Sequence, residues 1–204
     1  MADKPIYLAS RSPRRRELLR QIGVAFELIL LREMPRLPAD IDETPRADEA
    51  PDDYVLRITR EKALAAVGIM QTRRLAVRPV LAADTTVVCD TEILGKPANA
   101  ADASRMLSLL AGRMHRVLTA IAVANGDAVE ARVSESHVWF RALAPDEIRR
   151  YTASGEPVDK AGAYAVQGRA AAFITRIEGS YSGIMGLPLA ETAELLRSHG
   201  VIVP

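Results

Sequence analysis

Cysteine is almost absent from this chain, since Cys89 is the only one in 204 residues. A single thiol excludes an internal disulfide and a cysteine-based zinc site. Cys89 ends the apolar run Thr86–Cys89, which is typical of a small buried hydrophobic side chain. Aromatic residues make up only 4% of the sequence. The core must therefore be built mainly from Leu, Val, Ile and Ala.

The chain also lacks a charge excess and a long apolar run. Its 27 basic and 26 acidic residues leave a net charge of +1, which argues against binding nucleic acid through the overall field of the protein. A nucleic-acid-binding module would have to rest on Arg11–Arg20 alone, and we predict no such partner. No segment approaches membrane-spanning length, and the N-terminus lacks the apolar core of a signal peptide. We therefore expect a cytoplasmic protein without a membrane partner.

Helix and strand patterns alternate along the chain. Apolar runs predict strands at residues 6–9, 80–89, 117–123, 129–140 and 172–177. Helical spacing and capping residues predict helices that begin near residues 13, 52, 100, 145 and 188. Asn125-Gly126 is a strong hairpin signal, so part of the sheet must be antiparallel. We predict an α/β fold with a mixed, partly antiparallel sheet flanked by helices.

The segment from Ile6 to Gly23 carries the most specific local signal. Ser12 is a good N-cap and Pro13 a good first helical residue, which places Arg14, Arg15 and Arg16 in the first turn. Positive charge is unfavourable there, because a helix N-terminus already carries a partial positive charge and unpaired N–H groups. An anion at this point removes the conflict, so the pattern predicts a phosphate site. The alternative is a solvated, arginine-rich first turn.

Asp84 and Lys96 are candidates for chemistry on that phosphate. Asp84 follows the buried run 80–83, before the strand continues over 85–89, and is expected at the end of that first part, where a carboxylate can hold a metal ion or take a proton from water. Its alternative role is a turn or cap aspartate. Lys96 lies between Gly95 and Pro97, where the backbone geometry is restricted, so its ammonium can be directed at a phosphate. The alternative is an ordinary surface lysine.

Three further residues have weaker individual signals. Glu43 can share a hard cation with Asp84, unless it belongs to a solvated acidic loop. Lys62 can neutralise phosphate charge, although an exposed helical lysine is the default. Gln167, in the glycine-rich segment 155–168, can read the edge of a base through its amide, or it is a turn glutamine. Phosphoryl chemistry needs cationic side chains that neutralise the charge of a polyphosphate. It also needs carboxylates that hold a metal ion and activate a water.

Seven motifs, in this order, resemble the Maf family of nucleoside triphosphate pyrophosphatases and cover nearly the whole chain. They are YLASRSPRRRELL, DIDETP, YVLRITREKA, LAADTTVV, LGKP, GEPVDKAGAYAVQG and GSYSGIMGLPLAET. The resemblance implies a single domain over residues 1–204 with two lobes around a central cleft, and a homodimer. It also implies Mg²⁺- or Mn²⁺-dependent hydrolysis of a nucleoside triphosphate to the monophosphate and pyrophosphate.

The resemblance assigns roles residue by residue. Asp84 is the general base, and it shares the metal ion with Glu43. The positions associated with base selection are Arg14, Thr85 and Gln167. The positions that line the phosphate path are Ser10, Arg15, Lys62 and Lys96. The segment Arg32–Ala39 departs from the family pattern and resembles an insertion close to Glu43.

The last two motifs resemble the branch of the family that acts on dTTP and UTP. A house-cleaning role on modified pyrimidine triphosphates is compatible with the same motifs. Two alternatives remain open at this point: the branch that acts on 7-methyl-GTP, and a non-catalytic nucleotide-binding regulator of septum formation.

Overall fold

The computed structural model of the protein describes residues 5–32, 41–126 and 128–203. The strands are β1 (Ile6–Ala9), β2 (Phe26–Leu28), β3 (Val80–Cys89), β4 (Glu92–Leu94), β5 (Met114–Asn125), β6 (Ala128–Phe140) and β7 (Ile174–Glu178). The helices are α1 (Pro13–Gln21), α2 (Pro51–Thr72), α3 (Ala100–Leu110), α4 (Pro145–Ala153), α5 (Tyr181–Met185) and α6 (Leu189–Ser198). Two 3₁₀ segments, η1 (Ala161–Ala163) and η2 (Arg169–Phe173), precede β7. None of the helices described here is long and apolar enough to cross a bilayer.

The sheet is mixed, as the sequence predicts. Within the described residues it has seven strands in the order β2-β1-β3-β5-β6-β7, with β4 paired to β3. Strand β1 runs parallel to both β2 and β3, and Tyr7 lies opposite Val80. Strands β3 and β4 are antiparallel, as are β6 and β7. The prediction of an α/β fold with a partly antiparallel sheet is confirmed.

Most predicted elements are present, with two corrections. Asp84 is the fifth of the ten residues of β3 and does not end a strand. The last strand begins at Ile174 and not at Ala172, because Arg169–Phe173 forms a 3₁₀ segment. The predicted insertion Arg32–Ala39 lies, apart from Arg32, outside the described residues.

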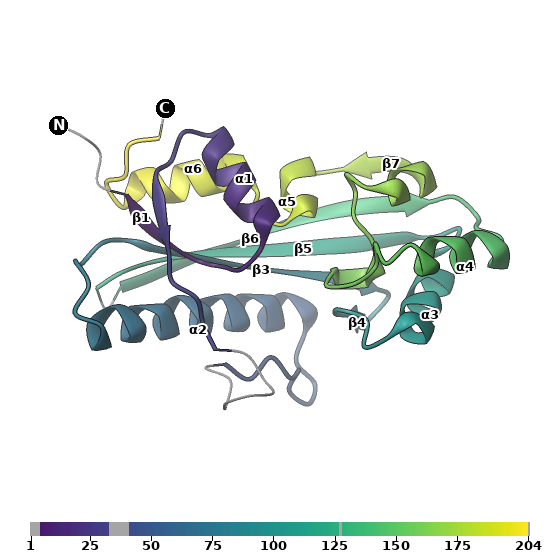
Figure 1. Cartoon of the computed structure of the whole chain (residues 1–204), viewed down its shortest axis with the longest axis horizontal. Coiled ribbons are helices and arrows are strands. Elements are labelled where there is room, and N and C mark those ends of the chain that lie inside the picture. The colour runs from purple at the N-terminus through teal and green to yellow at the C-terminus, as the bar shows by residue number, and fades with distance from the viewer. Residues whose placement is uncertain (1–4, 33–40, 127, 204) are drawn as a thin grey trace. The chain divides into compact units, whose positions relative to one another are not determined.

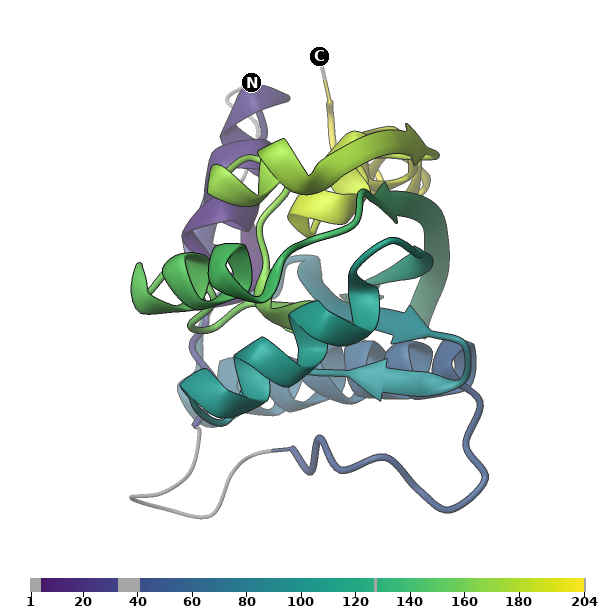
Figure 2. The same cartoon turned by 90° about the vertical axis from the view of Figure 1, so that its right-hand side faces the viewer.

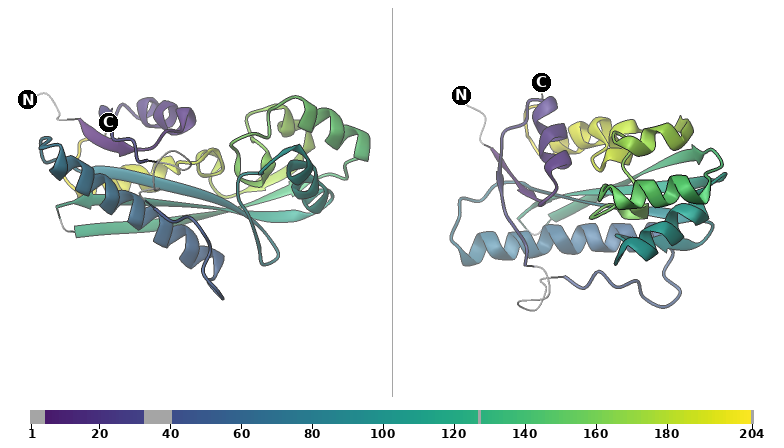
Figure 3. Two further views of the ribbon diagram at one scale, coloured as in Figure 1. Left: turned by 60° about the horizontal axis from the view of Figure 1, so that its bottom comes forward. Right: turned by 45° about the vertical axis from the view of Figure 1, so that its right-hand side comes forward.

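The chain divides into two compact units. The first comprises the described parts of residues 1–84, 119–133 and 186–204. In this unit, one face of helix α2 packs against the sheet. The helix contributes Ala63, Ala66, Val67 and Met70, and the strands contribute Tyr7, Val80, Ala82 and Ala122. Helices α1 and α6 lie on the other side of these strands (Figures 1 and 3).

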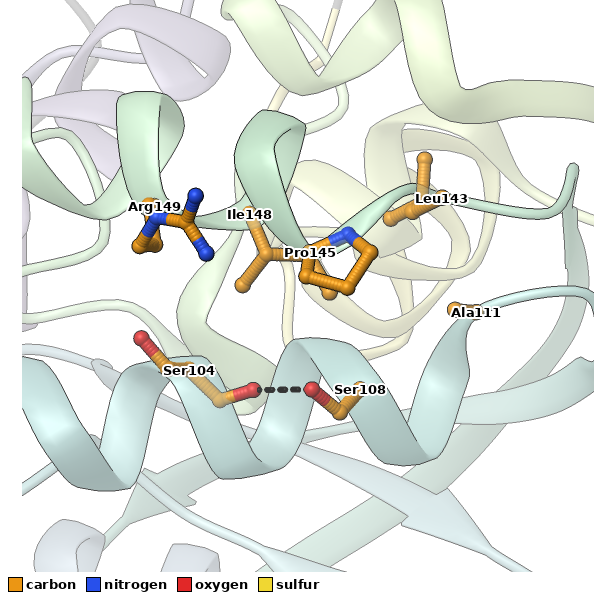
Figure 4. A pocket seen from close by; sticks show the side chains of 7 residues that line it. All are labelled: Ser104, Ser108, Ala111, Leu143, Pro145, Ile148 and Arg149. Carbon is orange, nitrogen blue, oxygen red and sulfur yellow. Dashed lines mark hydrogen bonds between the residues drawn. The ribbon is translucent and has the colours of Figure 1, made fainter.

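The second unit comprises residues 85–118 and 134–185. Helices α3 and α4 pack side by side in it (Figure 2), over a core that includes Leu107, Phe140 and Tyr164. A pocket of about 390 Å³ lies between the two helices (Figure 4). Its lining is largely apolar and includes none of the predicted site residues. The single domain over residues 1–204 and the cleft between two lobes stay predictions.

Gly162 shows how closely the second unit is packed around β3. Its backbone has φ +64°, and a Cβ built on it would lie 2.8 Å from Cγ2 of Val87. The Gly162 N–H donates to the carbonyl of Gly95 at 3.1 Å. Only glycine combines a left-handed backbone with so close an approach. The segment 155–168 is therefore fixed against both β3 and the Gly95-Lys96-Pro97 turn.

We expect Gly162→Ala to lower the free energy of unfolding by about 3 kcal/mol or more, because it adds steric overlap to backbone strain. Gly155→Ala is the matched control. Gly155 also has a positive φ (+74°), but nothing lies within 4 Å of its Cβ position. That variant should lose only about 1–2 kcal/mol from the backbone strain. Urea unfolding of both variants measures the difference, and equal losses would contradict the packing argument.

Candidate functional site

The first unit contains a lysine that is paired with two carboxylates. We call Lys62, Glu43 and Asp84 the Lys62 centre. Nζ of Lys62 lies 2.6 Å from Oδ1 of Asp84 and 2.8 Å from Oε1 of Glu43. The side chains of Lys62 and Asp84 are only 14% and 15% exposed, whereas that of Glu43 is 52% exposed. The three residues are distant in sequence. The structure thus brings Glu43, Lys62 and Asp84 together, and their roles toward a metal ion and a phosphate stay predictions.

Local periodicity explains why Lys62 reaches Asp84. Side chains alternate along a strand, so Asp84 is on the face of Val80 and Ala82, which packs against α2. Lys62 lies four residues before Ala66 on the buried stripe of α2, so it faces the same side of the sheet. The amphipathic helix and the strand alternation together bring the ammonium to the carboxylate.

The electrostatics of Lys62 are set by two opposing effects. Burial lowers the pKa of its ammonium, and the Asp84 and Glu43 carboxylates raise it by more, so the net pKa lies above its usual value. Lys62 therefore stays charged at neutral pH. Nearby Tyr54 has a pKa raised to about 12, first by burial and then by Asp84 and Glu43. The carboxylates of Asp84 and Glu43 thus act on the pKa of both Lys62 and Tyr54.

The first turn of α1 forms as the sequence predicts. Ser12 is the N-cap, and its hydroxyl accepts from the Arg15 N–H at 3.4 Å. Buried Ser10 accepts from the Ser12 N–H at 3.2 Å and from Nη1 of Arg15 at 3.5 Å. No acidic residue lies in this turn. The serine cap and the arginines of the first turn thus have the arrangement on which the phosphate prediction rests, and the binding of an anion there stays a prediction.

Arg15 connects this turn to the carboxylate centre. Its Nε donates to the Gly186 carbonyl at 2.8 Å, which fixes the guanidinium. Burial lowers its pKa, Asp84 and Glu43 oppose that effect, and neighbouring Arg14 adds to it. Arg15 remains charged, because the pKa of a guanidinium is far above neutral pH. Arg15 and Arg14 thus belong to one electrostatic group with Asp84 and Glu43.

Glu43 is held in place by side chains of α2 that the sequence motifs did not single out. The Tyr54 hydroxyl donates to the Glu43 carbonyl at 3.0 Å, and Nη2 of Arg57 donates to the Thr44 carbonyl at 3.2 Å. Arg57 also forms a bidentate pair with Glu49, at 2.6 and 2.7 Å. No sequence pattern predicts that a loop residue such as Glu43 will contact a particular helix residue such as Tyr54. Only the folded contacts identify this support for Glu43.

The remaining predicted residues belong to the second unit. Thr85 follows Asp84 on β3, and Lys96 and Gln167 are exposed on loops. The hydrogen bond from Gly162 to Gly95 brings the loop of Lys96 beside the segment that carries Gln167. Their approach to Asp84 stays a prediction, as do the base-selecting roles of Arg14, Thr85 and Gln167.

The donor set of the first unit suits a magnesium-like ion. Two carboxylates already converge on one cation, the Lys62 ammonium. Among the residues that the structure describes, no group of three or more His, Cys, Asp or Glu side chains is arranged to hold a metal. Mg²⁺ is commonly held by one or two carboxylates together with substrate phosphates, without a cage made of protein alone. Glu43 and Asp84 therefore fit such an ion when a phosphorylated substrate supplies the other oxygens.

The Glu49–Arg57 pair generates a pH prediction. The hydrogen bond from Arg57 is the largest cause that lowers the pKa of Glu49 from 4.5 to about 2. A lowered carboxylate pKa stabilises the fold above the unfolded value, and this contribution is lost as the pH falls from 4.5 toward 2. Glu49→Gln should therefore be less stable than the wild type near neutral pH, and the difference should shrink under acid. Urea unfolding of both proteins between about pH 7 and 3 measures it; a difference independent of pH would contradict the assignment.

Comparison with known proteins places the chain in a family. The Maf-like protein family model matches residues 5–199. A dTTP/UTP pyrophosphatase of Aromatoleum aromaticum is 57% identical over 196 residues, which cover 96% of this chain and 95% of that protein. Proteins with the same name from Nitrosomonas europaea and Dechloromonas aromatica are 54% and 50% identical, over 99% and 96% of this chain and 98% and 97% of their own lengths. These matches show that the chain belongs to the Maf family.

Proposed function

We propose that this protein hydrolyses dTTP and UTP between the α- and β-phosphates, giving the nucleoside monophosphate and pyrophosphate. The observation that carries the proposal is the Lys62 centre, in a chain whose relatives over nearly full length are named dTTP/UTP pyrophosphatases. A lysine, two carboxylates and the arginine-rich start of α1 together are the components that phosphoanhydride hydrolysis uses. The preference for dTTP and UTP rests on the names of the relatives.

The cationic groups of the first unit match a triphosphate. Arg15 is fixed by the Gly186 carbonyl and Ser10, so it meets a phosphate without a large loss of side-chain freedom. The N–H groups at the start of α1 add a partial positive charge beside it. Lys62 supplies an ammonium that can exchange a carboxylate for a phosphate oxygen. The family resemblance gives Lys96 of the second unit a phosphate-binding role as well.

Glu43 and Asp84 would hold a divalent ion, Mg²⁺ or Mn²⁺. Once bound, such an ion supplies positive charge to the phosphate oxygens and lowers the cost of charge that develops on them. The high exposure of the Glu43 side chain lets it turn from Lys62 to the ion. The Arg57 and Tyr54 contacts meanwhile keep its backbone in place.

Asp84 acts as the general base in the proposed reaction. It accepts a proton from water as the water oxygen bonds to the α-phosphorus, and the bond from that phosphorus to the bridging oxygen breaks. Pyrophosphate leaves with the bridging oxygen, and the proton passes from Asp84 to solvent. The fixed position of Asp84 in the middle of a strand supports this role, because a general base must be held within hydrogen-bond reach of the water.

A homodimer and a cytoplasmic location complete the proposal. The homodimer is supported by the family resemblance, and the location by the sequence pattern. Neither is needed for the chemistry described for the first unit.

The first test is pyrophosphate release by the purified protein with Mg²⁺ or Mn²⁺ on dTTP, UTP, CTP, GTP, ATP and 7-methyl-GTP. We expect clear preference for dTTP and UTP, with the monophosphate as co-product. Preference for 7-methyl-GTP would preserve the cleavage chemistry and refute the proposed branch. Tight binding of a nucleotide without turnover would refute the enzyme and favour a regulator.

Asp84→Asn should reduce turnover of UTP by roughly 10²–10⁴-fold, the usual contribution of a general base, with nucleotide binding nearly intact. Asp90→Asn is the matched control. Asp90 follows the same strand but pairs with exposed Arg113 at 2.6 Å, so this variant should keep wild-type rates. Single-turnover rates and equilibrium binding of UTP separate the two effects. Wild-type turnover in folded Asp84→Asn protein would refute the assignment.

A further inference from the structure

Gln167 lies on a long segment that is fixed at several points. Residues 154–168 connect α4 to η2, and Gln167 is exposed while Ala165 and Val166 are buried. The Gly168 N–H donates to the Ala165 carbonyl at 3.0 Å, which closes a tight turn around Gln167. The exposed amide is thus carried by a turn whose ends are ordered by contacts to the rest of the unit.

One end of this turn is held by a single carboxylate. Glu156 accepts from the Tyr151 hydroxyl at 3.0 Å, from the Arg169 N–H at 3.1 Å and from the Ala170 N–H at 3.5 Å. The two N–H groups belong to the start of η2, directly after Gln167 and Gly168. A carboxylate that accepts several hydrogen bonds holds its donors more firmly than a neutral acceptor does. Glu156 therefore fixes the chain immediately after Gln167.

Gly168 leaves the space that the carboxylate occupies. A Cβ on Gly168 would overlap the carboxylate oxygens of Glu156. Any larger residue would push Glu156 away from the Arg169 and Ala170 N–H groups. The glycine after Gln167 is therefore explained by the approach of this carboxylate.

The other end of the turn is anchored in the core. The Tyr164 hydroxyl lies 2.8 Å from Nε2 of His115, and both side chains are buried. Burial lowers the pKa of His115 to about 3, so the imidazole is neutral and pairs with the hydroxyl without a buried charge. Nζ of Lys160 donates to the Glu156 carbonyl at 2.5 Å, and this bond joins two residues near the start of the segment. Gln167 thus lies between a buried anchor and the Glu156 anchor.

A fixed orientation matters for an amide more than for other side chains. Glutamine presents one acceptor and two donors, and rotation of the amide exchanges them. Uracil and thymine offer an N–H donor and carbonyl acceptors on the pairing edge, whereas cytosine offers a ring-nitrogen acceptor and an amino donor. A freely rotating amide serves both edges equally. Only an amide held in one orientation discriminates between them.

We propose that Glu156 is a positioning residue that fixes the turn carrying Gln167 and thereby sets the preference for uracil and thymine over cytosine. This inference rests on the proposed function. Glu156 contacts the backbone after Gln167 and the Tyr151 hydroxyl. It acts on selectivity through the main-chain position from which the Gln167 side chain starts.

The test compares Glu156→Gln with Glu147→Gln on UTP, dTTP and CTP. Glu147 is the matched control, because its carboxylate also accepts three hydrogen bonds, from Nη1 and Nη2 of Arg141 and from the Ala144 N–H. Glu147 belongs to α4, the helix that precedes Glu156, and its bonds do not hold the Gln167 turn. We expect the ratio of kcat/KM for UTP to that for CTP to fall about tenfold or more in Glu156→Gln, and to stay at the wild-type value in Glu147→Gln.

Two readouts keep the inference separate from a loss of folding. Amide hydrogen exchange should increase over residues 167–171 in Glu156→Gln and not in the control. Tyr151→Phe removes only one bond to Glu156 and should lower the selectivity ratio in the same direction, by a smaller factor. These results would support the positioning role even if Glu156→Gln were poorly stable.

The possible outcomes distinguish a failure of the proposed function from a failure of the proposed role of Glu156. A wild-type protein that does not prefer dTTP and UTP over CTP would refute the proposed function and the inference together. A selective wild type with an unchanged ratio in Glu156→Gln would overturn the inference alone. Equal losses of kcat/KM on all three nucleotides would also overturn it, because they would make Glu156 merely structural.

Discussion

The ammonium of Lys62 between two carboxylates is the interaction on which the candidate site depends. A lysine with so little exposure is costly unless its charge is compensated, and Asp84 and Glu43 supply that compensation at 2.6 and 2.8 Å. The pair with Asp84 joins α2 to β3 across their packed face. The same contact keeps a carboxylate and a cation together at the point where, in the proposed reaction, phosphate and metal would bind.

In both units, side-chain hydrogen bonds to the main chain hold a candidate site residue in position. In the first, Arg57 and Tyr54 bind backbone carbonyls at Glu43 and Thr44. In the second, Glu156 binds backbone N–H groups after Gln167. In both, a charged or polar side chain fixes the main chain next to an exposed residue. Such residues keep a defined position while their own side chains remain accessible to a ligand.

Sequence reasoning succeeded where the signal was local. Ser12 and Pro13 predicted the start of α1, and capping predicted a helix from near residue 100, where Asn99 is the N-cap of α3, because capping is a contact between near neighbours. It missed β2 and β4, which are three residues long and too short for a periodic pattern. It also placed Asp84 at a strand end, because the polar residue interrupts an apolar run that the backbone continues.

By itself, the sequence determined the α/β class, the order of the main elements and the chemical types at the site, including Asp84, Lys62 and the arginines of α1. These follow from periodicity, capping and motif identity, which are properties of neighbouring residues. Only the tertiary structure decided which carboxylates share Lys62, that Arg57 and Tyr54 hold Glu43, and that Glu156 fixes the turn after Gln167. Such contacts join segments far apart in the chain, and their geometry depends on how helices and strands pack rather than on spacing along the sequence.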